Sequence, residues 1–107
     1  MKERVNETSE KYTPTDKQIE NWKQKHGEVF SYESDELACY LKRPDRKTIA
    51  AAAAVGSTDP VKYAEIMIAN CWLGGNEALK TEDRYFFGLQ QQLTALVEIK
   101  TGTLKKL

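Results

Sequence analysis

Residues 64–87, AEIMIANCWLGGNEALKTEDRYFF, decide the fold because they hold the end of one predicted helix, two adjacent glycines and the start of another. Apolar side chains along the first part recur three and four residues apart, at Ala64, Met67, Ile68, Cys71 and Trp72. This spacing predicts a helix with one apolar face. We interpret Gly74 and Gly75 as its C-cap, in which one glycine ends the helix in the left-handed conformation and the second lets the chain reverse.

A phosphate-binding loop is the alternative interpretation of the glycine pair. Such a loop places its glycines between a strand and a helix and usually carries a lysine soon afterwards, as in GxxxxGK[ST]. Gly74 and Gly75 instead follow a helix, and the next residues, NEALK, do not match that motif. The pattern favours a structural corner over a phosphate site.

Two helices are predicted to begin upstream of residue 64, a further helix and then the one that carries the apolar face described above. The first has Asp45 as its cap and continues through an alanine-rich run to Gly56. The second begins at Pro60, where the missing N–H costs nothing, and Thr58 or Asp59 caps it.

A last helix is predicted after the glycines. Thr81 is its expected cap, and Glu82 and Asp83 are favourable near the positive end of its dipole. Its apolar stripe consists of Phe86, Leu89, Leu93, Leu96 and Val97, and Lys100, Lys105 and Lys106 lie near its end.

Residues 28–44, EVFSYESDELACYLKRP, predict a β-hairpin. Their β-branched and aromatic side chains are typical of strands, and ESDE at 33–36 supplies the turn. Pro44 ends the second strand because it cannot donate to a ladder. The residues expected to face inward on this strand are Leu37, Cys39 and Leu41.

The N-terminal part of the chain has two characters. Residues 1–13 are polar and predict a flexible tail. Thr15 and Gln18 then fit a capping box, which predicts a short helix over residues 16–26 with a narrow apolar stripe at Ile19 and Trp22. The sequence as a whole predicts a single α+β domain at 14–107. In it, a short β-hairpin is followed by and packed on three α-helices, with the additional short N-terminal helix.

Composition excludes several broad classes of function. The chain has 107 residues with 16 basic and 16 acidic side chains, so its formal net charge is zero. This balance argues against general binding to nucleic acid or to a membrane surface, which usually needs excess Lys and Arg. No apolar run approaches the ~20 residues of a membrane span, and the N-terminus lacks the apolar region of a secretory signal. We therefore expect a cytoplasmic protein.

The residues that most often perform chemistry are sparse. Cys39 and Cys71 are predicted core residues, because Cys71 lies at the C-terminal end of a helix, where the dipole disfavours a thiolate. His26, the single histidine, is expected to be an exposed residue of a helix end. No nucleophile pairs with it by spacing, and the soft ligands are too few for zinc. We expect no enzyme activity, no cofactor and no metal site.

Exposed aromatic and basic residues are the candidates for protein binding. Aromatic residues near the glycine loop either cover the junction of the last two helices or form an apolar patch for a partner. The hairpin tyrosines raise the same question, and the basic segment LKRPDRK is either a solvated face or a site for an acidic partner. The candidate binding residues are Tyr32, Tyr40, Arg43, Arg46, Trp72, Tyr85 and Phe87.

The order of two motifs, RPDRKT at 43–48 and NCWLGG at 70–75, resembles the small tail assembly chaperones of tailed phages and prophages. Members of that family combine such elements with a helix that starts at Asp-Pro and with a long C-terminal helix. The resemblance covers residues 28–107 and leaves the first 27 uncovered. The residues that match the motifs are Arg43, Pro44, Asp45, Trp72, Gly74 and Gly75.

The resemblance implies a non-enzymatic role. Such chaperones are thought to coat the long, aggregation-prone tape-measure protein until tail-tube subunits polymerise around it. In many relatives a translational frameshift adds an extension that recruits the tail-tube protein. The matching residues are then structural: Pro44 and Asp45 would fix the corner from strand to helix, and Trp72 would anchor a helix pair.

A different class of function stays open beside the chaperone. The alternative is a small cytosolic protein-binding adaptor or regulatory domain of mobile-element origin. Such a domain would bind its protein partner through a face that contains Tyr32 and Tyr40.

Overall fold

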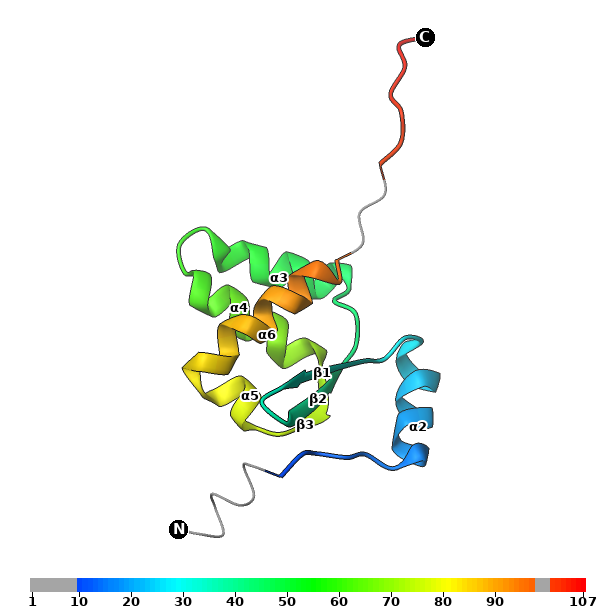
Figure 1. The fold of residues 1–107 in the computed structure, drawn as a ribbon. Helices are drawn as coiled ribbons and strands as arrows, with labels where there is room; N and C mark the ends of the chain where they lie inside the picture. The colour runs from blue at the N-terminus through cyan, green and yellow to red at the C-terminus, as the bar shows by residue number, and fades with distance from the viewer. Residues whose placement is uncertain (1–9, 98–100) are drawn as a thin grey trace.

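The computed structural model describes residues 10–97 and 101–107 and shows an α+β fold (Figure 1). The elements along the chain are α2 (Asp16–His26), β1 (Phe30–Ser34), β2 (Leu37–Leu41), α3 (Arg46–Gly56), α4 (Pro60–Cys71), β3 (Trp72–Gly75), α5 (Ala78–Thr81) and α6 (Asp83–Ala95). The strands form one antiparallel sheet in the order β1-β2-β3. None of the helices in the described ranges combines the length and hydrophobicity that a membrane span needs.

The helix starts follow the predicted caps. Thr15 accepts a hydrogen bond from the Gln18 backbone N–H at 3.1 Å and completes the capping box of α2. Asp45 caps α3 by accepting from the N–H of Thr48 at 2.8 Å. Asp59 caps α4, with Pro60 at its first position. These three caps confirm the starts of the corresponding helices.

The hairpin has the predicted turn and inward face. Asp35 and Glu36 link the strands with φ angles of 50° and 64°. Two consecutive positive φ values match the twist of a tight hairpin. Leu37, Cys39 and Leu41 of β2 are buried and belong to the core. The hairpin prediction is therefore confirmed.

The glycine pair corrects the predicted C-cap. Helix α4 ends at Cys71, Trp72 is already extended, and the chain continues as β3 along β2. In this register Gly74 lies opposite Tyr40 and Gly75 lies opposite Cys39. The glycines thus belong to a third strand. Their role is to let two backbones approach closely, and the C-cap interpretation is wrong.

The last helix is shorter at both ends than predicted. Thr81 closes the short helix α5 and donates its hydroxyl to the Glu77 carbonyl, so it is not the cap of α6. Helix α6 starts at Asp83 without a side-chain cap and ends at Ala95. Residues 101–107 carry no helix or strand. Their threonines and glycine have low helix propensity, so the predicted extension to Lys105 and Lys106 is wrong; Lys100 lies outside the described residues.

One core joins the inner face of the sheet to the helices. Its members are buried side chains from β2, α3, α4, α5 and α6: Leu37, Cys39, Leu41, Ala52, Met67, Ile68, Cys71, Ala78, Leu79, Tyr85, Leu89 and Leu93. The predicted apolar face of α4 is confirmed for its helical members. Trp72 differs, because it belongs to β3 and is only half-buried.

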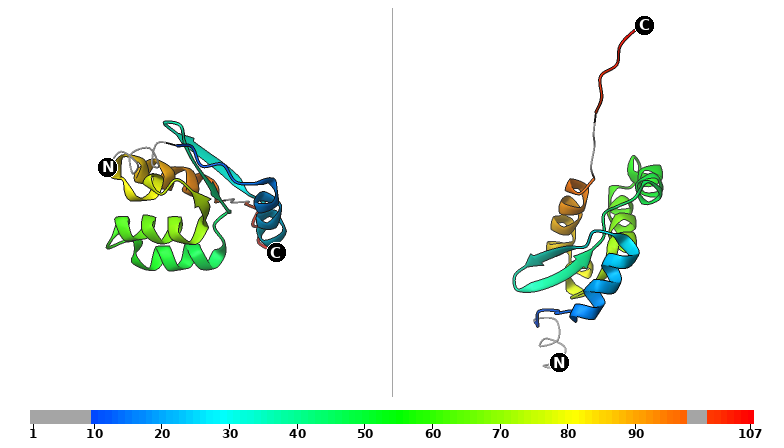
Figure 2. Two further views of the ribbon diagram at one scale, coloured as in Figure 1. Left: turned by 90° about the horizontal axis from the view of Figure 1, so that it is seen from below. Right: turned by 90° about the vertical axis from the view of Figure 1, so that its right-hand side faces the viewer.

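The outer face of the sheet is covered by the N-terminal segment. Figure 2 shows residues 10–15 and α2, in blue, on the side of the hairpin away from the other helices. Tyr12 donates its backbone N–H to the side chain of Asn76 at 2.8 Å. Residues 10–13 therefore contact the domain, and the predicted tail boundary at residue 13 is too late. Residues 1–9 of that predicted tail lie outside the described residues.

Candidate protein-binding site

The two hairpin tyrosines do not share a face. Tyr32 pairs with Cys39, whose side chain belongs to the core, and Tyr40 is the next residue along β2. Successive side chains of a strand point to opposite faces, so Tyr32 faces the helices and Tyr40 faces the N-terminal segment. The predicted binding face that contains both tyrosines does not exist.

Arg43 acts as a clamp between three parts of the chain. Its guanidinium donates to Glu28 Oε1 at 2.9 and 2.8 Å and to the backbone carbonyl of Leu96. It also lies 5.1 Å from the centre of the Phe30 ring. The guanidinium of Arg43, which is planar and can donate several hydrogen bonds, is therefore used for contacts within the fold. Arg46, in contrast, is exposed at the start of α3.

The two motifs meet in space at one corner of the fold. The backbone N–H of Lys42 donates to the carbonyl of Cys71 at 2.9 Å. Pro44 is buried beside this contact in sequence, and Asp45 then caps α3. The chain therefore leaves β2 and enters α3 next to the point where α4 becomes β3. RPDRKT and NCWLGG are two halves of one structural junction.

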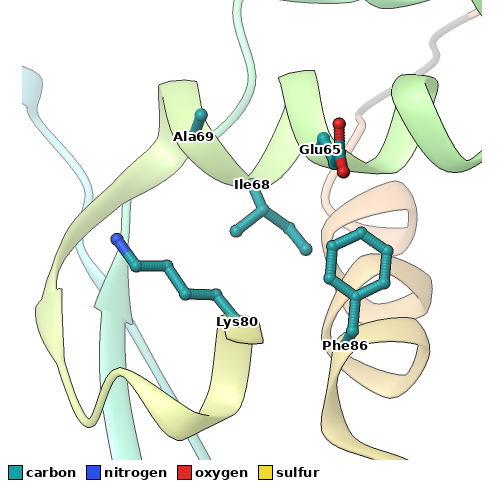
Figure 3. A pocket seen from close by; sticks show the side chains of 5 residues that line it. All are labelled: Glu65, Ile68, Ala69, Lys80 and Phe86. Carbon is teal, nitrogen blue, oxygen red and sulfur yellow. The ribbon is translucent and has the colours of Figure 1, made fainter. Parts of the chain in front are cut away.

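Helices α4, α5 and α6 surround an open apolar hollow of about 120 Å³ (Figure 3). Ile68 of α4 and Phe86 of α6 point toward one another, and Glu65 and Lys80 lie on the rim. Lys80 also lies 4.5 Å from the centre of the Trp72 ring. Trp72 therefore contacts a rim residue of this α4–α6 hollow through a cation–π interaction, and it also packs against the core.

Three consecutive aromatic residues at the start of α6 differ in their exposure to solvent. Tyr85 is only 7% exposed and donates its hydroxyl to Asp35 of the hairpin turn at 3.1 Å. This burial corrects its assignment as a binding residue, since the side chain supports the core. Phe86 is half-buried at the hollow. Phe87 is 52% exposed, and its ring packs edge-on against Phe86 with 5.0 Å between centroids.

A second hollow of about 220 Å³ lies between the hairpin and α6. Its lining residues come from distant parts of the chain: Phe30, Ser31, Tyr32, Leu41, Gln92 and Leu96. Tyr32 is thus a wall of this β1–α6 hollow. The sequence did not indicate it, because no local pattern pairs a strand with the end of a helix some 60 residues later.

An aromatic cluster on the outer face of the sheet was also missed. The rings of Trp22 and Tyr40 stack with 5.8 Å between centroids, and Tyr12 lies 6.1 Å from Tyr40. Trp22 was assigned only to the stripe of a short helix, and Tyr12 to a tail. The only sequence signal was the presence of large aromatic side chains in otherwise polar segments.

The two thiols are part of the core. Cys39 and Cys71 are fully buried and unpaired. Burial raises the pKa of Cys39 to about 12 and that of Cys71 to about 11. Both are therefore protonated thiols at neutral pH, which confirms their predicted packing role. Among the described residues no group of His, Cys, Asp and Glu has the arrangement of a metal site.

These pKa shifts predict a loss of stability in alkaline solution. In the unfolded chain the thiols ionise near the ordinary value of 9.0, whereas in the folded chain they stay protonated to about 11 and 12. The stabilising contribution is complete below pH 9 and is lost as the pH rises through the folded values. Urea unfolding measured below and above pH 9 should show this fall, and a smaller fall in Cys39→Ala. A flat profile would contradict it.

Comparison with known proteins supports the fold and adds no function. No protein-family model matches the chain, and no curated protein is significantly similar to it. A solved structure of an uncharacterised protein from Bacillus stearothermophilus is similar, with a TM-score of 0.60 at 18% sequence identity. The match covers 82% of this chain and 99% of the other. At this identity the likeness shows a shared fold alone.

Proposed function

We propose that this chain is a non-enzymatic tail assembly chaperone of a phage or prophage, which works in the cytoplasm of the bacterial host. Its client is the tape-measure protein, and the tail-tube protein is a further partner. The observation that carries the proposal is the ordered pair of motifs, RPDRKT and NCWLGG, which resemble motifs of the chaperone family.

The position of the motif residues supports this assignment. They lie at a junction, where the N–H of Lys42, next to Arg43, donates to the carbonyl of Cys71 and Asp45 caps α3. A family defined by such a junction shares a scaffold, and its specificity lies on the surfaces that the scaffold presents. Motif residues with a structural role are therefore consistent with a protein that functions by binding a partner through its surface.

The α4–α6 hollow is the surface that we assign to the client. It is apolar at its base and carries one acidic and one basic side chain, Glu65 and Lys80, on its rim. Phe87 stands exposed beside it. An amphipathic client helix fits such a groove by inserting apolar side chains between two helices. A shallow hollow gives weak individual contacts, and repetition along a long client supplies the overall affinity.

Phe87→Ala is expected to weaken binding to the tape-measure protein about thirtyfold, as loss of an aromatic hot spot does. The melting temperature should stay unchanged, because the ring is half-exposed. Binding of the purified full chain to the tape-measure protein of the same locus, measured by calorimetry, tests this. Leu104→Ala is the matched control, since Leu104 is fully exposed and remote in sequence from the hollow. Equal affinities for both variants and the wild type would count against the assignment.

The alternative function, a small adaptor or regulatory domain of mobile-element origin, is favoured by one separate feature. The β1–α6 hollow is larger than the α4–α6 hollow, and Tyr32, a residue of the expected adaptor face, lines it. A pull-down with the full chain that returns a protein unrelated to phage tails, and loses it on Tyr32→Ala, would support the adaptor.

A further inference from the structure

Two parts of the N-terminal segment cover the outer face of the sheet, and they are held there to different degrees. Ala38 points to this face and is nevertheless completely buried, because residues 10–12 cross it. Asn76 holds this crossing by donating to the Glu10 carbonyl and accepting from the N–H groups of Tyr12 and Ala38. The crossing segment is therefore fixed by two partly buried hydrogen bonds to Asn76, whose side chain is itself held on the sheet by the buried bond from Ala38.

Helix α2 continues the same cover with far fewer contacts. None of its residues is buried, and Ile19 and Trp22 are half-buried at most. The contact that stands out is the Trp22 ring, which stacks on Tyr40 at 5.8 Å and lies over Gly74. A Cβ added at Gly74 would lie 3.3 Å from this ring, so the missing side chain of the glycine leaves space for the Trp22 ring.

Both ends of α2 have a fixed point next to them. On its N-terminal side Pro14 is buried and Asn76 holds residues 10–12. On its C-terminal side Gly27 has a φ of 83°, which favours glycine, and Glu28 is then held by Arg43. A displaced α2 therefore stays tethered to the domain on both sides.

We propose that the outer face of the sheet is a second docking surface for the client, and that α2 covers it until a client helix takes its place. The proposal rests on the chaperone function proposed above. The occupant is an amphipathic helix that carries an aromatic side chain, because α2 itself shows that Tyr40 and Gly74 accept such a helix. A client helix with a wider apolar face than α2 buries more surface there and displaces it.

The proposal has a direct consequence for affinity. A surface that is free for only a fraction of the time binds its partner more weakly by that fraction. Removing the Trp22 ring, which holds α2 on the sheet, therefore tightens client binding. If the ring contacted the client instead, its removal would weaken binding.

Full-length Trp22→Ala is expected to bind the tape-measure protein about tenfold more tightly than the wild type. Trp22→Phe, which keeps a ring on Tyr40, is the control and should bind as the wild type does. Tyr40→Ala also loosens α2, but it removes the ring on which the client helix would pack. This variant should therefore bind the tape-measure protein less tightly than the wild type. Hydrogen exchange of the free protein should show less protection in α2 than in α4 and α6.

The outcomes separate the two proposals. Unchanged or weaker binding by Trp22→Ala, or α2 amides as protected as those of α4, overturns the docking surface and leaves the chaperone function standing. If neither the wild type nor Trp22→Ala binds the tape-measure protein, the chaperone function fails, and the docking surface fails with it.

Discussion

Gly75→Ala is expected to unfold much of the population at physiological temperature. A Cβ at this position would lie 2.4 Å from Cys39 Cβ and 2.5 Å from Cys39 Cα. The obstacle is the backbone of the central strand, which cannot move without breaking the sheet. The φ of 155° adds backbone strain for any residue with a side chain. Overpacking and strain together cost about 4 kcal/mol, close to the whole stability of a small domain.

Gly74→Ala is the matched control for Gly75→Ala, one residue away in the same strand. Its added Cβ would meet the Tyr12 hydroxyl at 2.9 Å and the Trp22 ring at 3.3 Å. Both are ends of side chains in the N-terminal cover, which can shift. We expect a cost below about 1 kcal/mol, measured by urea unfolding. Equal stability of the two variants would contradict the pairing of β3 with β2.

Asn76→Ala is expected to cost about 3 kcal/mol, because it leaves three backbone groups without partners. The Asn76 side chain accepts from Tyr12 and Ala38 at 2.8 and 2.9 Å and donates to Glu10 at 2.6 Å. The Ala38 N–H is buried, so water cannot replace the lost acceptor. The loss is measured as the change in free energy of unfolding in urea.

Asn76→Asp separates the contributions of the two ends of this side chain. It keeps the oxygen that accepts from Tyr12 and Ala38, and it replaces the donor to Glu10 by a second oxygen. Its stability should fall between those of the wild type and Asn76→Ala. Asn76→Ala within about 0.5 kcal/mol of the wild type would show that the crossing of residues 10–12 is not held in this way.

Local signals in the sequence were sufficient wherever a short segment determines its own structure. The capping box of Thr15, the caps of Asp45 and Asp59 and the turn at Asp35 each depend on hydrogen bonds or dihedral angles within four residues. Such contacts are encoded in the residues themselves. These elements, and with them the α+β class, were therefore predictable.

The third strand was not predictable in this way. Trp72–Gly75 contains two glycines, which are rare in strands, and its pairing partner lies more than 30 residues earlier. The glycines are required by the close approach of Cys39, and this contact exists only in the folded chain. A helix-ending signal and a glycine-containing strand look alike when only the local sequence is considered.

The candidate binding residues also fall into two groups, those whose exposure follows from local geometry and those whose environment depends on distant contacts. The exposure of Phe87 next to the half-buried Phe86 follows from helical geometry, which cannot direct two adjacent side chains to one seam. The burial of Tyr85 depends on Asp35, 50 residues away. The separation of Tyr32 from Tyr40 follows from strand alternation once the register is known. Tyr12 and Trp22 acquire their roles through contacts with distant residues, among them Tyr40.

Co-expression of this full chain with the tape-measure protein of its own locus tests the chaperone function most directly. The measured quantity is the fraction of tape-measure protein in the soluble lysate, with and without this chain. The account predicts that the client is largely insoluble alone and that, with this chain, it is soluble and co-purifies with several copies of it. A client that stays equally insoluble, with no copies of this chain attached, would contradict the account.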